Sequence, residues 1–145
     1  MAVLRERRAG VDVGADRVID WHRSMPELAA AATSISLLMP HVEPYLVRSV
    51  RRVLPSLDGP VRAEAESWAR QELAHHVEHR RFNAALAEAC PGVARVERLV
   101  RRAYGWLGRT RSTAFGVAFA AASEAIAFGI ARWADRHVAD LFDGA

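Results

Sequence analysis

The chain is poor in several residue types, and each absence limits what it can be. Only one of its 145 residues is a cysteine, Cys90, which excludes a disulfide framework and a cysteine-based zinc finger. Glycine and proline are also few, at 9 and 6 residues, while 51% of the residues are apolar. This composition excludes a disordered or collagen-like chain. It favours a globular protein with a buried core.

Lysine is missing altogether, so the 20 basic residues are all arginine. Because 17 acidic residues oppose them, the net charge is only +3. A charge this small is weak support for a nucleic acid or an acidic membrane as partner, so we expect neither. We interpret the arginine excess as a habit of composition before any demand for anion binding.

The length of the chain predicts a single domain. The first residues, 1–8, are charged and lack the apolar stretch of a signal peptide, which favours the cytoplasm. We expect residues 1–20 to form a loosely ordered lead-in and residues 21–145 to form one helical domain.

Strand patterns are scarce as well, whereas helical spacing recurs throughout the chain. The pattern predicts an all-α, up-and-down bundle, because long helices alternate with short turns. Ser24 is a candidate cap for the first helix, and Pro40 and Pro44 are expected to kink or split it. The expected helices cover about residues 25–54, 60–89, 93–107 and 112–142.

The longest apolar run extends from Thr113 to Ala131 and contains one charged residue, Glu124. A membrane span tolerates a central carboxylate poorly, and alanine contributes little to insertion. We therefore predict a buried helix of a soluble bundle and no membrane contact.

The second expected helix carries the most informative stretch, in which Glu72, His75 and His79 are spaced three and four residues apart. Residues at this spacing share one helix face, which Asn83 continues. A carboxylate followed three residues later by an imidazole is a ligand pair of di-metal helical bundles. The alternative is a set of solvated side-chain pairs. His76 and Glu78 are off this face and are expected at the surface.

Two further carboxylates stand in apolar surroundings. Glu124 needs a metal ion, an arginine or an exposed position, because burying an unpaired carboxylate costs several kcal/mol. Glu43 follows an apolar segment, and it is either a second inward carboxylate or a helix-start carboxylate stabilised by the dipole. Three helices thus each offer one candidate inward carboxylate, and one of these carboxylates is followed three residues later by a histidine.

These segments resemble the bacterial family of predicted metal-dependent hydrolases, which have a ferritin-like fold. The strongest likeness is Gln71-Glu-Leu-Ala-His75 followed by His79, Phe82 and Asn83. Two further segments are similar to the family's pattern, namely Leu38-Met-Pro-His-Val-Glu-Pro-Tyr and Ser123-Glu-Ala-Ile-Ala127. Together they cover about the first half of the family's length.

The resemblance implies a ferritin-like bundle with a divalent metal, such as Fe, Mn or Zn, in a possibly di-nuclear centre. The ligands it implies are Glu43, Glu72, His75 and Glu124, with His79 beside them. It also implies hydrolysis of a small-molecule substrate by metal-activated water.

The family carries a second Glu-x-x-His on a later helix, and no such pair follows Glu124 in this chain. Two copies of Glu43, Glu72 and His75 would supply four carboxylates and two histidines, so we expect a homo-oligomer, most simply a dimer. One alternative is a non-catalytic helical remnant of the fold. A less favoured one is an arginine-rich module that binds anions or nucleic acids through Arg48, Arg51, Arg52, Arg95, Arg98 and Arg102.

Overall fold

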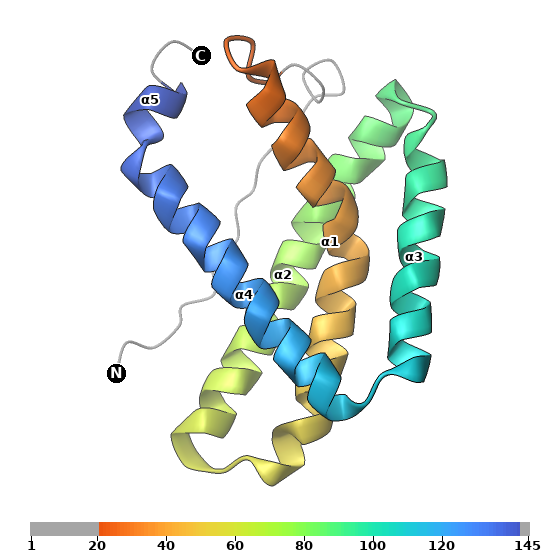
Figure 1. The fold of residues 1–145 in the computed structure, drawn as a ribbon, viewed down its shortest axis with the longest axis vertical. Helices are drawn as coiled ribbons and strands as arrows, with labels where there is room; N and C mark the ends of the chain where they lie inside the picture. Colours follow the sequence, from red (N-terminus) through yellow and green to blue (C-terminus); the bar gives the residue numbers. More distant parts are fainter. Residues whose placement is uncertain (1–20, 143–145) are drawn as a thin grey trace.

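The computed structural model describes residues 21–142 of the chain, so the expected lead-in at 1–20 lies outside the described residues. Five α-helices and one short 3₁₀ helix follow one another with short turns between them (Figure 1). Their bounds are α1 Pro26–Val53, η1 Leu54–Ser56, α2 Gly59–Ala89, α3 Val93–Thr110, α4 Thr113–Arg136 and α5 Val138–Phe142. The described part of the chain contains no strand, which confirms the predicted all-α class.

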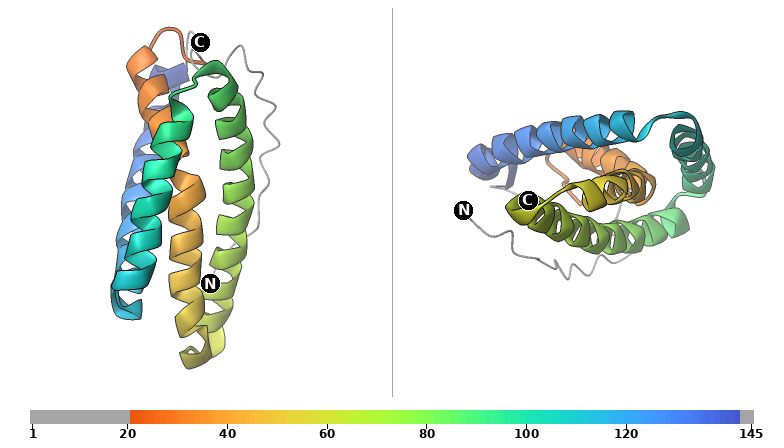
Figure 2. Two further views of the ribbon diagram at one scale, coloured as in Figure 1. Left: turned by 90° about the vertical axis from the view of Figure 1, so that its right-hand side faces the viewer. Right: turned by 90° about the horizontal axis from the view of Figure 1, so that it is seen from below.

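Helix α1 is the centre of the bundle, since it packs against α2, α3 and α4. Seen from below, it lies between α2 on one side and α4 on the other, with α3 covering the end (Figure 2). The first four helices run alternately down and up (Figure 1), as an up-and-down bundle requires. Any side chain on the inner faces of α1 therefore has two or three helices around it.

Several expected boundaries needed correction. Pro40 and Pro44 do not split the first helix, because both lie inside the continuous α1. The cap predicted at Ser24 is wrong: the N-cap is Met25, and no side chain caps it. The Met25 backbone N–H instead donates to Nδ1 of the buried His22, and the Ser24 hydroxyl contacts the same nitrogen. The expected last helix is interrupted at His137, which separates α4 from α5.

The main core cluster lies where α1 meets α3 and α4. Its centre is Tyr45, whose ring makes edge-to-face contacts with Tyr104 at 5.6 Å and with Phe119 at 5.8 Å between centroids. Aromatic pairs in this arrangement contribute about 0.5–1.5 kcal/mol beyond the area they bury. The cluster holds α4, which carries Glu124, against the centre of α1.

The expectation that residues 113–131 form a buried helix is wrong for the single chain. Only Gly116 and Ala120 of α4 are buried, while Ile126 and Phe128 are each 65% exposed. The C-terminal half of α4 leans away from α2 (Figure 1). Among the described helices, α4 alone is long and apolar enough to cross a membrane, which by length and composition is weak evidence.

Gly116 allows α4 to approach α1 closely, because a Cβ atom there would lie 2.4 Å from the Ser49 hydroxyl oxygen and 2.9 Å from its Cβ. We expect Gly116→Ala to lower the free energy of unfolding by about 1–3 kcal/mol through overpacking. Gly129→Ala on the same helix is the control, since nothing lies within 4 Å of its Cβ position. It should be neutral or stabilise by up to about 1 kcal/mol. Urea unfolding followed by circular dichroism measures both, and equal effects would contradict the close approach.

Candidate metal centre

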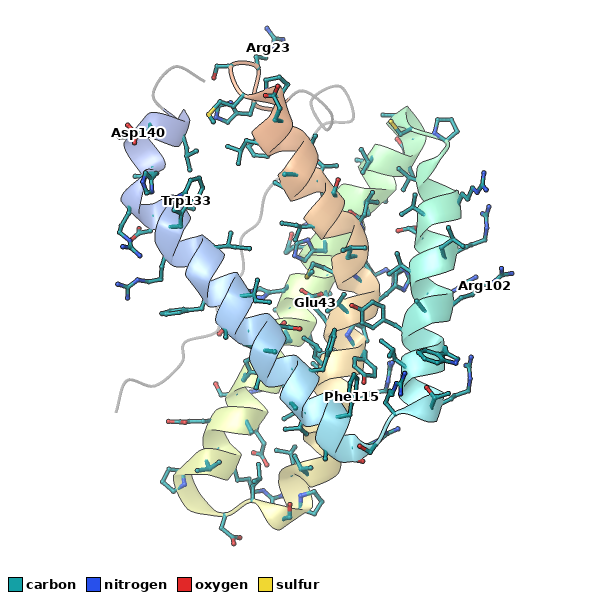
Figure 3. All side chains as sticks on the ribbon, in the orientation of Figure 1. Arg23, Glu43, Arg102, Phe115, Trp133 and Asp140 are labelled. Atoms are coloured by element: carbon teal, nitrogen blue, oxygen red, sulfur yellow. The ribbon has the colours of Figure 1, made fainter. Side chains whose placement is uncertain are left out.

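Three side chains from two helices converge near the middle of the bundle. Glu43 on α1 and Glu72 and His75 on α2 each offer one ligand atom, and these atoms lie within 4.8 Å of one another. Glu43 is 3% exposed and Glu72 is 8% exposed, while His75 is partly buried. Figure 3 shows Glu43 deep in the molecule, between α1, α2 and α4. Of the residues predicted as ligands, the structure brings these three together.

The helical spacing on α2 produces the first pair. Nδ1 of His75 lies 3.5 Å from Oε1 of Glu72, one turn away. The hydrogen bond to Glu72 raises the pKa of the His75 imidazole, and burial opposes this rise. Because α1 and α2 are antiparallel neighbours, the same face of α2 meets the face of α1 that carries Glu43.

The electrostatics of the cluster are those of a site for a cation. Burial first, and then the nearby carboxylates of Glu72 and Glu124, raise the pKa of Glu43 to about 8. Oε2 of Glu43 is buried and has no hydrogen-bond partner. Neighbouring carboxylates repel one another, and a divalent cation would reduce this repulsion and bind the oxygen that lacks a hydrogen bond. The donor set of carboxylate oxygens and imidazole suits Fe, Mn or Zn.

Glu124 reaches the same region from α4 but is not one of the three residues within 4.8 Å. It is half-buried, and its pKa is raised by burial and by Glu72. The neighbouring indole of Trp68 and the charge of His75 partly oppose this rise. Glu124 therefore adds a third carboxylate at the edge of the cluster.

His79 lies one turn beyond His75, and its Nε2 is 3.8 Å from Oε1 of Glu43. Its other ring nitrogen, Nδ1, is 2.9 Å from the hydroxyl oxygen of Ser36. Burial lowers the pKa of His79, and the charge of His75 lowers it further, which favours the neutral imidazole that binds metals. Asn83, which continues the same face of α2, is 2% exposed.

His76 was expected at the surface, and this expectation is wrong. Its side chain is only 21% exposed, and its Nδ1 atom lies 3.8 Å from Oε2 of Glu43. This Nδ1 atom is buried and has no hydrogen-bond partner. The spacing of four residues between Glu72 and His76 was the signal that could have identified it. Glu78 is partly exposed and pairs with Arg81 at 3.5 Å.

His76 also lines a cavity of about 380 Å³. Sequence reasoning did not single out His41, which lies in the same wall, and burial lowers the pKa values of both histidines. The cavity lies between α1, α2 and α3, and its lining consists of Pro40, His41, His76, Arg80, Asn83, Ala84, Ala87 and Glu97. No carboxylate of the cluster lines this cavity, and His76, whose Nδ1 lies 3.8 Å from Glu43, is the link between the two.

The six arginines considered as an anion-binding surface are all exposed, on α1 and on α3. Figure 3 shows Arg102 pointing away from the bundle. Exposed arginines of this kind are expected on the solvated outer faces of helices. Their positions give no support to an anion-binding surface.

Fold and site together define an all-α bundle with a buried group of carboxylates and a histidine that could hold a metal ion. A family model described as "Predicted metal-dependent hydrolase" matches residues 5–145. The chain belongs to this family, as its motifs indicated. Comparison with curated proteins and with solved structures gives no match.

Proposed function

We propose that the protein is a metal-dependent hydrolase whose metal site is the group formed by Glu43, Glu72 and His75. The observation that carries the proposal is the convergence of these three ligand atoms within 4.8 Å, with one buried Glu43 oxygen that has no hydrogen-bond partner, in a chain of a metal-dependent hydrolase family. Structural ion-pair networks also gather carboxylates, but they include the cations that balance them. Here the nearest carboxylates raise the pKa of Glu43 instead.

Glu43, Glu72 and His75 would hold the ion, with Glu124 beside them. A divalent ion supplies Lewis acidity and lowers the pKa of water, which permits hydrolysis near neutral pH. Glu124, whose pKa is raised, is placed to hold or accept a proton at its carboxylate. A substrate in the adjoining cavity would contact His76, whose Nδ1 faces Glu43.

The proposal is tested by elemental analysis of the purified protein, followed by a hydrolysis assay with a panel of simple esters, amides and phosphoesters. We expect bound Fe, Mn or Zn and a hydrolytic activity that a chelator removes and the metal restores. Absence of metal in protein prepared with these ions present contradicts the proposal. Bound metal without turnover of any ester, amide or phosphoester favours the non-catalytic alternative.

We further propose that a second copy of the chain covers the exposed apolar side chains in the C-terminal half of α4, namely Ile126, Phe128 and Ile130. These residues are 65%, 65% and 51% exposed, far more than a helix of a closed bundle would leave. Ile126 and Ile130 share one side of the helix, whereas Phe128 lies on the side of Glu124, one turn away, so a chain that covers Phe128 also covers the edge of the metal site. A second copy would bring further carboxylates and histidines to that edge.

Light scattering coupled to size exclusion should give twice the 16.0 kDa of one chain. Changing Ile126, Phe128 and Ile130 together to serine should yield a monomer, because the apolar contact is lost. The control is Val77→Ser, which removes an exposed apolar side chain on α2 (53% exposed) and should leave the dimer intact. A wild-type monomer that instead floats with lipid vesicles would overturn the second copy as occupant.

A further inference from the structure

Next to the carboxylate cluster lies a buried polar group that the proposed hydrolase mechanism does not use. It consists of Ser36 on α1 and Asn83 on α2, which are 7% and 2% exposed. Their side chains are hydrogen-bonded to each other, and the Ser36 hydroxyl is also hydrogen-bonded to the imidazole of His79. In such a group each hydrogen bond needs one donor and one acceptor, so the role of one side chain determines the role of the next.

The backbone at Pro40 is the first constraint. Proline has no N–H, so the Ser36 carbonyl, four residues earlier in α1, lacks its usual helical donor. Nδ2 of Asn83 supplies a donor to this carbonyl oxygen at 3.0 Å. Since a carbonyl oxygen only accepts, this contact determines which end of the Asn83 amide is the NH₂ group.

The amide orientation in turn determines the role of the Ser36 hydroxyl. Oδ1 of Asn83 lies 3.0 Å from Ser36 Oγ and can only accept, so the hydroxyl donates its one proton to it. The contact of 2.9 Å between Ser36 Oγ and Nδ1 of His79 must then be donated by the imidazole. The proton of neutral His79 consequently resides on Nδ1, and Nε2 keeps its lone pair.

The free Nε2 lies 3.8 Å from Oε1 of Glu43. This separation is too long for a hydrogen bond. Two ligand atoms bound to one ion can be separated by such a distance, because each metal–ligand bond is about 2.0–2.2 Å long. Glu43 is thus shared between the group with Glu72 and His75 and a contact with His79.

We propose that Ser36 and Asn83 are positioning residues that hold the His79 proton on Nδ1, so that Nε2 of His79 is a further ligand of the ion bound by Glu43. This inference rests on the proposed metal site and adds a ligand and its supporting contacts to it. Outer hydrogen bonds of this kind commonly determine the tautomer and orientation of a ligating histidine.

The test uses ¹⁵N-histidine-labelled, metal-free protein, in which long-range ¹H–¹⁵N correlations at pH 8 report the protonated nitrogen of each ring. His79 is assigned by the signal that is missing in His79→Gln. We expect the Nδ1–H form in wild type and its loss in Ser36→Ala. Cobalt titration should show an affinity about 10-fold or more lower for Ser36→Ala.

Ser49→Ala is the matched control, because Ser49 is an equally buried serine on α1 whose hydroxyl donates to the Tyr45 carbonyl. It should change neither the tautomer nor the affinity, and Ser36→Thr, which keeps a hydroxyl, should retain the Nδ1–H form. A wild-type Nε2–H form, or unchanged cobalt affinity in Ser36→Ala, would overturn the inference and leave the proposed function intact. A wild type that binds no cobalt would overturn the proposed function itself.

Discussion

Glu72→Gln and His75→Ala are each expected to lower the affinity for a divalent metal by at least about 100-fold, which is about 2.7 kcal/mol. Both residues offer an atom to the group that lies within 4.8 Å. Substitution of residues that only support metal ligands typically costs 10–100-fold, so loss of a ligand itself should reach or exceed the upper end. Isothermal titration with Zn²⁺ and Mn²⁺ measures the difference.

The control for these variants is Glu78→Gln, on the same helix. Glu78 pairs with Arg81 on the partly exposed side of α2, so its loss removes a negative charge without removing a candidate ligand. Its metal affinity should stay within about 3-fold of wild type, since exposed ion pairs contribute about 0–1 kcal/mol. If all three variants weaken binding equally, the effect is one of general charge and the assigned ligand group is wrong.

Glu43→Gln is expected to stabilise the metal-free protein at alkaline pH, by roughly 2–4 kcal/mol above pH 8. In the folded protein the pKa of Glu43 is raised from 4.5 to about 8. Such a group contributes its full stability below its unfolded pKa, and this stability is lost as the pH rises through the folded pKa. Wild type should therefore weaken relative to the variant between about pH 4.5 and pH 8.

His76 and His79 act in the opposite direction. Burial lowers the pKa values of His76 and His79, so these groups destabilise the folded state at acid pH and cease to do so above about 6.5. Because wild type and Glu43→Gln both contain them, the difference between the two proteins isolates the carboxyl group. Urea unfolding in the presence of a chelator at pH 5, 6.5 and 8.5 measures this difference.

Adding a divalent metal should offset the advantage of the variant at alkaline pH. At 100 times its dissociation constant an ion stabilises the folded state by about 2.7 kcal/mol, and the variant, which lacks the charged oxygens, should gain little of this. A stability difference that is the same at every pH would show that Glu43 ionises freely in the folded protein. That result would remove the main electrostatic argument for a cation.

The helices and one ligand pair could be predicted from local sequence. The three-residue spacing of Glu72 and His75 places them on one turn whatever the rest of the chain does. Pro91 and Gly92 end α2 for an equally local reason, the lack of helical propensity. The continuity of α1 could not be predicted in this way, because packing against three helices and the contact from Asn83 compensate for the prolines.

The roles of Ser36 and His76 depend on the pairing of α1 with α2. In the sequence Ser36 is 43 residues from His79 and shows no motif, yet the two side chains are in contact. The exposure of α4 was also unpredictable, since an apolar helix has the same composition whether a bundle covers it or not. Both depend on which helix faces lie opposite each other, a property of the assembled bundle.

The scarcity of cysteine, glycine, proline and strand patterns by itself determined the class, because local propensity and composition decide whether a chain forms long helices. The spacing on α2 likewise determined that Glu72 and His75 lie together. Only the tertiary structure decided that Glu43 joins them and that its Oε2 atom is buried without a hydrogen-bond partner. The physical reason is that burial and the repulsion between carboxylates depend on distances between helices, which no local pattern contains.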